Sequence, residues 1–598
     1  MSTPYVFTQD VQSSKNFPSF EYSGTETDNV YHEDREIAGI MYRAANAAYD
    51  DISGLWSQPD GSNPSYAIAQ NTDGTINYLY MPPMGSSTWT TWQGTGQPDV
   101  YHAVNYGMSP ASADNTGALQ AALNAAYMSG NGGIIFIPPG TYPFTGTVIL
   151  PDPPPVPGSD NGIIIAGAGG STNLQQTQFR DLFSFTGLAS GRGVRFRDLR
   201  ISYTAASLIG QPAAIRVSDC EAITCERVYF YDCPQALNLE NEANQCGLRD
   251  CIIDYGNGTS PLGGRVMVSI SGTEDFIDHC IIKQVPQGHS PPGPAGCTGI
   301  VIASPGVAFI TNTHISDFTI GIEVQGGGPY PLRSYVSNVV CESWTYGVKI
   351  VPTSDAGRIS QMFFRDCVFA REDDSTDTTS TGVYIDTDGG ANAHVSDIFF
   401  DNCMCYQWNG PGIQINAGQN IVITGGRYGS NATSMPTSGG IAITGTPTNV
   451  TITGADFSPT VPNPAGGTYG TQPYAFSITA AVEGLYVRGC NLTGYGIPPV
   501  PIYAYTTALD VEVTDCAGYN DLGMVLQTTP RTGAFSNTSA WTNAPNGWFG
   551  PVAFYVMGTG YVSFGTNSTL LTQGEFTLSP GQTASVGGTI AHFLAIGK

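Results

Sequence analysis

The sequence has little charge and very few lysines. Of its 598 residues only 22 are basic against 48 acidic, which gives a formal net charge of −26. Lysine occurs only as Lys15, Lys283, Lys349 and Lys598. So acidic a chain repels the phosphates of nucleic acids and of anionic membranes. The composition therefore argues against a nucleic-acid-binding protein and, with 74 glycines, favours a turn-rich extracellular type of protein.

Long hydrophobic runs and targeting signals are also missing. No run approaches the roughly 18 apolar residues that a membrane-spanning helix needs. Residues 1–30 have neither the basic start nor the apolar centre of a secretory leader. We therefore expect no membrane insertion, and either release by cell lysis or a leader that this sequence does not include.

Disulfide and zinc patterns are absent as well. All 13 cysteines lie between Cys220 and Cys516, an odd number without framework spacing or paired Cys-x-x-Cys motifs. Many recur at equivalent positions of a repeat, which favours a buried ladder of small side chains about 4.8 Å apart. We expect assembly in a reducing cytoplasm, with no metal and no other cofactor.

The sequence has instead one pattern that returns between Gly193 and Asp521. A small residue is followed by an apolar, a variable and an apolar residue, which is the alternation of a strand with one inward face. The copies are Ala-Ile-Arg-Val (214–217), Ala-Leu-Asn-Leu (236–239), Gly-Ile-Val-Ile (299–302), Gly-Ile-Glu-Val (321–324), Gly-Val-Lys-Ile (347–350), Gly-Val-Tyr-Ile (382–385), Gly-Ile-Gln-Ile (412–415) and Gly-Ile-Ala-Ile (440–443).

A second pattern, centred on cysteine, follows several of these copies. Its members are 248–253, 277–282, 364–369, 400–405, 487–492 and 513–518, for example Leu-Arg-Asp-Cys-Ile-Ile and Phe-Asp-Asn-Cys-Met-Cys. The tightest spacing, from Ile215 to Leu237 and from Ile300 to Ile322, is 22 residues. Such a period, built of short strands and Gly, Asn or Asp turns, predicts the coils of a parallel β-helix, about eleven in number.

The first hundred residues lie outside the repeat. Asp28 to Trp56 fits an amphipathic helix, and Thr75–Tyr80 fits a strand. We interpret residues 1–100 as an attachment or assembly segment, with a simple N-terminal cap as the alternative.

Residues 101–150 contain the most specific motif. Asp114 or Thr116 is expected to cap a helix that ends at Gly130, and a strand is expected at Ile134–Ile137. The helix would close the open end of the solenoid, whose core and strand edges would otherwise be exposed.

Asp114 to Ala126, followed by Gly-Gly-Ile-Ile-Phe-Ile-Pro-Pro-Gly-Thr-Tyr (132–142), resembles the opening motif of the pectate-lyase-like superfamily, which includes polygalacturonases and bacteriophage tailspikes. With the repeats, the resemblance covers residues 101–525. It implies a right-handed single-stranded parallel β-helix, and the tailspike type implies a homotrimer. Catalytic residues do not transfer, because the superfamily hosts several chemistries and the paired Asp, Gly-His-Gly and Arg-Ile-Lys of polygalacturonases are absent.

Residues 526–598 follow the repeat and contain no cysteine. Short apolar runs between turn residues predict a small C-terminal β-sandwich that binds, trimerises or closes the helix. The expected class is thus all-β, with three parts: 1–100, the β-helix 101–525 and the sandwich 526–598.

In a stacked solenoid the variable residues of the tetrads form outward columns. The first column is expected to be Arg216, Asn238, Val301, Glu323, Lys349, Tyr384, Gln414 and Ala442, and the second, two residues further along, Glu240, Gln325, Val351, Asp386 and Asn416. Amides, carboxylates and an aromatic ring suit a polysaccharide. The predicted substrate-binding residues are Arg216, Asn238, Glu240, Gln325, Lys349, Tyr384, Gln414 and Asn416.

Glycoside hydrolysis usually needs two carboxyl groups. We assign Glu323 as the acid and Asp386 as the base, with Asp388 as the competitor of Asp386, and expect a separation of about 10 Å. Lys349 beside Glu323 argues against the acid role. Two alternatives stay open: a solvated polar ladder, and a lyase that uses Lys349 or Arg216 to neutralise a uronate.

Other candidates are weaker. Arg371–Asp377 is expected to be a solvated loop, with a calcium site as the alternative. His289 and His394 are expected to be surface residues, with the role of a catalytic base as the alternative. Arg195 and Arg197 are expected to pair with Asp181 and Asp198, with binding of an anionic sugar as the alternative.

The combined features indicate a virion-associated, extracellular tailspike that binds and depolymerises a bacterial surface polysaccharide and attaches to phage tail or baseplate proteins. The alternatives are a secreted bacterial polysaccharide lyase or hydrolase, and a non-catalytic adhesin or structural virion protein.

Overall fold

The computed structural model describes most of the chain from Val100 to Gly518 and, outside that range, only the backbone of individual strands. Within that range it leaves out residues 129–131, 151–161, 187–192, 205–209, 242, 257–263, 285–295, 304–305, 328–331, 372–377, 388–392, 463–469, 481, 496–501 and 505–508. The chain divides into two compact units, Met1–Gln97 and Pro98–Lys598.

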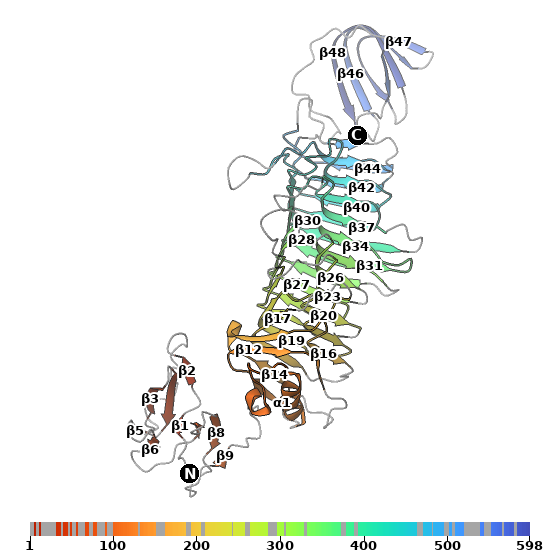
Figure 1. Ribbon diagram of the computed structural model, residues 1–598. Helices are drawn as coiled ribbons and strands as arrows, with labels where there is room; N and C mark the ends of the chain where they lie inside the picture. Colours follow the sequence, from red (N-terminus) through yellow and green to blue (C-terminus); the bar gives the residue numbers. More distant parts are fainter. Residues whose placement is uncertain are drawn as a thin grey trace. The chain divides into compact units, whose positions relative to one another are not determined.

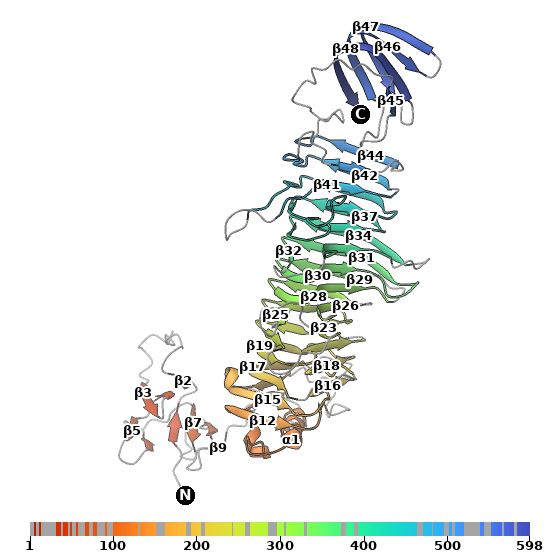
Figure 2. The same ribbon diagram turned by 45° about the horizontal axis from the view of Figure 1, so that its top comes forward.

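A parallel β-helix forms most of the second unit. Among the described residues, 35 strands, β10 to β44, form one continuous ladder in which a strand pairs mainly with the strands two or three further along the chain. About three strands therefore make one coil, and the coils stack one above another (Figures 1 and 2). The predicted parallel β-helix is confirmed.

The pairings sort the strands into three faces. Face A carries the repeated tetrads and consists of β13 (Val148–Ile149), β16 (Phe183–Thr186), β18 (Ile215–Ser218), β20 (Leu237–Glu240), β23 (Val266–Ile270), β26 (Thr298–Ala303), β33 (Thr381–Ile385), β36 (Ile413–Ile415), β39 (Gly439–Ile443), β41 (Tyr474–Ile478) and β43 (Ile502–Ala504).

Face B follows face A along the chain. It consists of β10 (Val100–His102), β11 (Gly133–Phe136), β14 (Ile163–Ala166), β21 (Gly247–Arg249), β24 (Asp275–Asp278), β27 (Val307–Thr311), β29 (Leu332–Ser337), β31 (Arg358–Arg365), β34 (His394–Asp401), β37 (Gln419–Thr424), β40 (Thr448–Thr453), β42 (Glu483–Arg488) and β44 (Leu509–Thr514).

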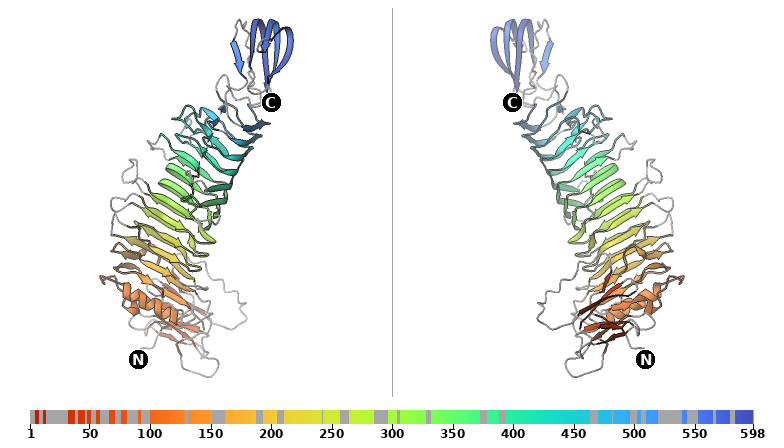
Figure 3. Two further views of the ribbon diagram at one scale, coloured as in Figure 1. Left: turned by 90° about the vertical axis from the view of Figure 1, so that its right-hand side faces the viewer. Right: turned by 90° about the vertical axis from the view of Figure 1, so that its left-hand side faces the viewer.

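Face C completes each coil with β12 (Gly140–Phe144), β15 (Thr172–Gln176), β22 (Ile252–Tyr255), β25 (Ile281–Gln284), β32 (Val368–Arg371), β35 (Met404–Tyr406) and β38 (Arg427–Gly429). Four longer strands run through a corner: β17 (Val194–Tyr203) and β19 (Thr224–Tyr231) from face B to C, and β28 (His314–Gln325) and β30 (Val340–Ile350) from face C to A. Figure 3 shows the stacked coils from two sides.

The cysteine-centred motif marks the tight turn from face B to face C. The residue before the cysteine has a left-handed backbone, with φ of 53° at Asp250, 51° at Asp366 and 52° at Asn402. Asp and Asn tolerate this conformation better than other non-glycine residues. The turn aims the next side chain inward, and all 13 cysteines are buried as free thiols. The predicted ladder of buried cysteines is confirmed.

A single α-helix among the described residues, α1 (Thr116–Met128), packs against β10, β11 and β13 at the start of the β-helix (Figure 1). Asp114 Oδ1 accepts hydrogen bonds from the backbone N–H groups of Thr116 and Thr145, both at 3.0 Å, and so joins the helix start to the end of β12. Leu119, Ala122 and Leu123 are fully buried. This is the predicted capping helix. The described residues also include two 3-10 turns, η2 (Ala103–Tyr106) before the helix and η3 (Gly169–Ser171) after β14.

The helix predicted for Asp28–Trp56 is wrong. Strands occupy this segment, and β3 pairs antiparallel with β4 in the register Ile37↔Ile40, with only two residues between the strands. Short apolar spacing fits a helix or a hairpin, and strand pairing decides between them. The strands of the first unit are β1 (Tyr5–Phe7), β2 (Val11–Ser13), β3 (His32–Ile37), β4 (Ile40–Ala45), β5 (Ala48–Asp50), β6 (Leu55–Ser57), β7 (Tyr66–Gln70), β8 (Ile76–Tyr80) and β9 (Thr90–Thr91).

The described strands beyond the β-helix form one antiparallel sheet in the order β45-β48-β46-β47. Their bounds are β45 (Ser539–Thr542), β46 (Val552–Phe564), β47 (Asn567–Leu578) and β48 (Thr583–Gly597). A sandwich requires a second sheet packed on this one, so the sandwich stays a prediction. In the described parts of the chain, no helix has the length and apolar character to cross a membrane.

Candidate functional site

Face A carries the predicted outward columns in register. The strand pairings place Glu323 beside Lys349, Lys349 beside Tyr384, and Tyr384 beside Gln414. Their neighbours Ile322, Val348, Val383 and Ile413 point inward and are fully buried. Alternation along each strand explains the difference, because successive side chains point to opposite faces. We call the two outward columns the face A track.

Each coil contributes one rung to the track, and the rung at Ser269 does not follow the repeated tetrad. Ser269 stands between Asn238 and Val301 in the pairings. Its strand reads Val-Met-Val-Ser-Ile and lacks the small residue that marks the other tetrads. The track is also partly covered: Asn238 is 8% exposed and Val301 6%.

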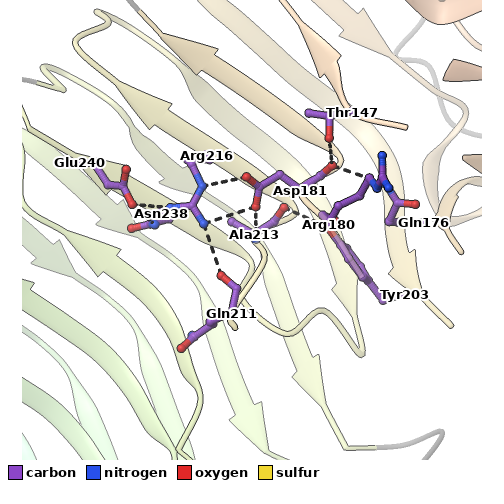
Figure 4. Close-up of polar contacts among 10 residues, drawn as sticks. All are labelled: Thr147, Gln176, Arg180, Asp181, Tyr203, Gln211, Ala213, Arg216, Asn238 and Glu240. Carbon is purple, nitrogen blue, oxygen red and sulfur yellow. Dashed lines mark hydrogen bonds and ion pairs between the residues drawn. The ribbon is translucent and has the colours of Figure 1, made fainter. Parts of the chain in front are cut away.

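The lower end of the track is a network around Arg216 (Figure 4). Arg216 Nε donates to Asp181 Oδ2 at 2.8 Å, and another guanidinium nitrogen donates to Glu240. Asn238 Nδ2 also donates to Glu240, at 2.6 Å. Burial lowers the pKa of Arg216, but the hydrogen bonds that it donates to the Asp181 and Glu240 carboxylates, and the attraction of their charges, outweigh burial and raise the pKa. Asp181, expected beside Arg195 or Arg197, therefore pairs with Arg216.

The upper end of the track is a second network, around Asp386. Asp386 Oδ2 accepts the hydroxyl of Tyr384 at 2.7 Å and the amide of Asn416 at 3.0 Å. Asn416 in turn accepts the amide of Gln414 at 3.0 Å. Four predicted site residues thus meet in one hydrogen-bonded cluster. Asp388 lies outside the described residues, and Gln325 lies on the track beside Ala303.

Glu323 and Lys349 form an ion pair between the two networks. Lys349 Nζ lies 2.9 Å from Glu323 Oε1, and the two side chains are 28% and 15% exposed. Asp386 lies two rungs above Glu323 and two residues further along its strand, so their backbones are about 12 Å apart at standard rung and residue spacings. The roughly 6.5–9.5 Å of inverting enzymes is a distance between carboxyl groups, so the two side chains would have to lean toward each other to reach it.

Face C holds a carboxylate pair that the sequence analysis did not identify. Burial raises the pKa of Asp317, and a hydrogen bond from His314 at 3.1 Å lowers the pKa of Glu342. Carboxyl groups whose pKa values are moved apart are a feature of acid–base sites. The strand pairing shifts register between Ser316 and Phe318, so simple alternation does not predict which way Asp317 points.

The remaining sequence candidates lie apart from the track. Arg195 and Arg197 are exposed and pair with Glu226 and Asp198, at 3.8 and 3.1 Å. His394 begins β34 on face B and is exposed. His289 and the loop after Arg371 lie outside the described residues. Among the residues that the structure describes, no group of three or more His, Cys, Asp or Glu side chains is arranged to hold a metal ion.

No protein-family model matches the chain, and a search of curated proteins found no match. Solved structures similar to it include tailspike protein 3 of bacteriophage CBA120, at 13% identity and a TM-score of 0.48 over 80% of this chain and 87% of that one. A mutant tailspike protein of E. coli bacteriophage HK620, in complex with a pentasaccharide, matches at 12% identity and a TM-score of 0.46 over 87% and 96% of the two chains. The catalytic unit of an α-1,3-glucanase from Streptomyces thermodiastaticus matches at 14% identity and a TM-score of 0.41 over 77% and 85%. These are similarities of fold, which the strand pairings of this chain establish independently.

Proposed function

We propose that this protein is a virion-associated tailspike that binds a bacterial surface polysaccharide along the face A track and depolymerises it as a glycoside hydrolase. The observation that carries the proposal is the unbroken register of the track from Arg216 to Gln414. It offers carboxylates, amides, hydroxyls and an aromatic ring at a repeat of about 4.8 Å. Sugar hydroxyls bond to such groups, and sugar rings pack on aromatic faces.

Glu323 and Asp386 are the carboxyl groups proposed for cleavage, with Asp388 as the competitor of Asp386. One would protonate the leaving oxygen and the other would activate water. The sugar chain would pass over the Lys349 rung between them. The opening motif and the right-handed β-helix that it implies support a tailspike, in which residues 1–100 attach to tail or baseplate proteins and three chains assemble.

A non-catalytic adhesin is the second candidate. It is favoured by the Glu323–Lys349 ion pair, because the carboxyl group of the proposed acid already has a cationic partner. In that case the track binds glycan and cleaves nothing.

Incubation of the purified protein with capsular polysaccharides tests both candidates. New reducing ends without ultraviolet absorbance support the hydrolase, and absorbance from an unsaturated uronate supports a lyase. Binding without any product supports the adhesin. Light scattering on the eluting protein tests the homotrimer, which a monomeric mass would contradict.

A further inference from the structure

A pocket of about 480 Å³ lies at the turn from face A to face B. Its walls come from three successive coils, at the starts of β31, β34 and β37, and from Thr387, which directly follows Asp386 of the track. Its polar lining consists of Arg358, Ser360, Thr387, His394, Ser396 and Gln419. The volume is in the range of small-ligand sites.

The pocket is cationic and polar within a strongly acidic chain. Arg358 and His394 stand side by side in the strand pairing and are both exposed. In the part of the chain that the structure describes, Arg358 forms no ion pair, whereas Arg216, Arg365 and Arg488 each pair with a carboxylate. The guanidinium therefore has its hydrogen-bond donors available to a ligand.

Carboxylates next to the pocket are already engaged. Asp397 accepts hydrogen bonds from Ser396 Oγ and Asn420 Nδ2, both at 3.0 Å. Asp386 is held by Tyr384 and Asn416. None of the described lining residues is an acid. The described lining thus combines an arginine with hydroxyl and amide groups and contains no carboxylate, which suits an anion.

We infer that this pocket binds an anionic substituent of the sugar chain whose backbone lies on the face A track. The inference rests on the proposed function, since Thr387 links the pocket to the track through its neighbour Asp386. Arg358 would bond the anion in a bidentate way, and Ser360 and Thr387 would donate hydroxyl hydrogen bonds. The shared chemistry is a carboxylate, phosphate or sulfate group on a hexose.

Saturation-transfer NMR tests the pocket with glucuronate, glucose 6-phosphate, glucose 6-sulfate and glucose as probes. We expect at least one anionic probe to bind and glucose to bind at least tenfold more weakly. Arg358→Gln should weaken the anionic probe tenfold or more, because a hydrogen bond to a charged group is lost. Arg358→Lys should retain part of the affinity. Arg488→Gln, an exposed arginine on the same face, is the matched control and should change nothing.

Equal binding of glucose and all three anions, or full affinity in Arg358→Gln, would overturn the inference. The polysaccharide assay separates this failure from failure of the proposed function. Suppose that a capsular polysaccharide and its carboxyl-reduced form are bound equally well, and that Arg358→Gln affects neither. This result would contradict anion binding in the pocket and would still support polysaccharide binding on the track. If the anionic probes bind in an Arg358-dependent way but no polysaccharide binds, the result would support an anion site at Arg358 and contradict the proposed function.

Discussion

Lys349 and Glu323 meet on the track as an ion pair, with 2.9 Å between Nζ and Oε1. The tetrads Gly-Ile-Glu-Val and Gly-Val-Lys-Ile put the two side chains on the same outward column of adjacent rungs. Because both side chains are mostly covered, the pair is less screened by solvent than a surface ion pair. Two roles are open to Glu323: a carboxyl group that acts on the sugar, or a partner that only holds Lys349.

Removing the two proposed catalytic carboxyl groups distinguishes these roles. Glu323→Gln and Asp386→Asn should each lower the rate of depolymerisation by about 10² or more, because general acid–base groups contribute about 10²–10⁴. Affinity for the polysaccharide should change little. Release of reducing ends measures the rate, and calorimetry measures the binding.

Asp401→Asn is the matched control for Asp386→Asn. Asp401 lies on face B in an exposed pair with Arg365, at 3.5 Å, whose loss should be nearly neutral. Full activity in both Glu323→Gln and Asp386→Asn would remove the two residues from the mechanism.

Two substitutions of Tyr384 distinguish packing of a sugar ring on its aromatic face from hydrogen bonding by its hydroxyl group. Tyr384→Phe keeps the ring and loses the hydroxyl that donates to Asp386, whereas Tyr384→Ala loses both. If a sugar ring packs on the aromatic face, Tyr384→Ala should weaken polysaccharide binding by a further factor of about 2–10, from about 0.5–1.5 kcal/mol. Equal affinities of the two variants would show that no sugar packs there.

Asp275 makes stability depend on pH. Its side chain is fully buried on the inner side of β24, and Oδ2 has no hydrogen-bond partner among the described residues. Burial raises its pKa to about 8, although the N–H of Cys246 donates to Oδ1 at 2.9 Å and opposes the shift. Below about pH 4 the carboxyl is protonated in both the folded and the unfolded chain, and there is no penalty. As the pH rises from 4 to 8, only the unfolded chain ionises and stability falls.

Asp275→Asn should therefore gain stability relative to the unchanged chain between pH 4 and pH 8, on the order of 4 kcal/mol by pH 7. Urea unfolding at several pH values measures the difference. Asp278, on the outer side of the same strand, is the control. Burial would raise its pKa, but hydrogen bonds from Thr311 and Asn312 lower it. Asp278→Asn should therefore cost stability at neutral pH, and this cost should shrink as the pH falls from the ordinary pKa of Asp278 through its lowered pKa. A flat pH profile for the Asp275→Asn difference would contradict the account.

The cysteine ladder predicts inert thiols. All 13 are buried, and burial raises the pKa of residues such as Cys225 and Cys405. Since thiolates are the reactive form, an aromatic disulfide reagent should find almost no fast thiol in the folded protein and all 13 after unfolding in guanidinium. Rapid reaction of several thiols in the folded protein would mean that these cysteines are accessible to solvent, and would contradict a fully buried ladder.

The repeat can be predicted from the sequence because each rung needs the same alternation, with apolar residues pointing inward and a variable residue pointing outward. The cysteine motif predicts a turn, since Asp or Asn takes the left-handed position and the next side chain turns inward. Asp28–Trp56 was misread because nothing in a short apolar pattern separates a helix from a hairpin. Ser269 was missed because its strand lacks the small residue of the other tetrads.

Side-chain partners were harder to predict than rungs. The pairing of Arg216 with Asp181 joins residues 35 apart, through rungs whose intervening loops hide the register. Asp317 sits at a bulge, where alternation fails. The spacing of Glu323 and Asp386 has two parts, an offset between rungs and an offset along the strand, and the rung count alone leaves out the second.

A crystal structure of the Asp386→Asn variant with an oligosaccharide prepared from a bound polysaccharide tests the central claim most directly. We expect the sugar chain to run along face A, with a ring against Tyr384 and hydroxyls bonded to Glu323 and Asn416. A sugar chain bound on face B or face C, with face A empty, would contradict it.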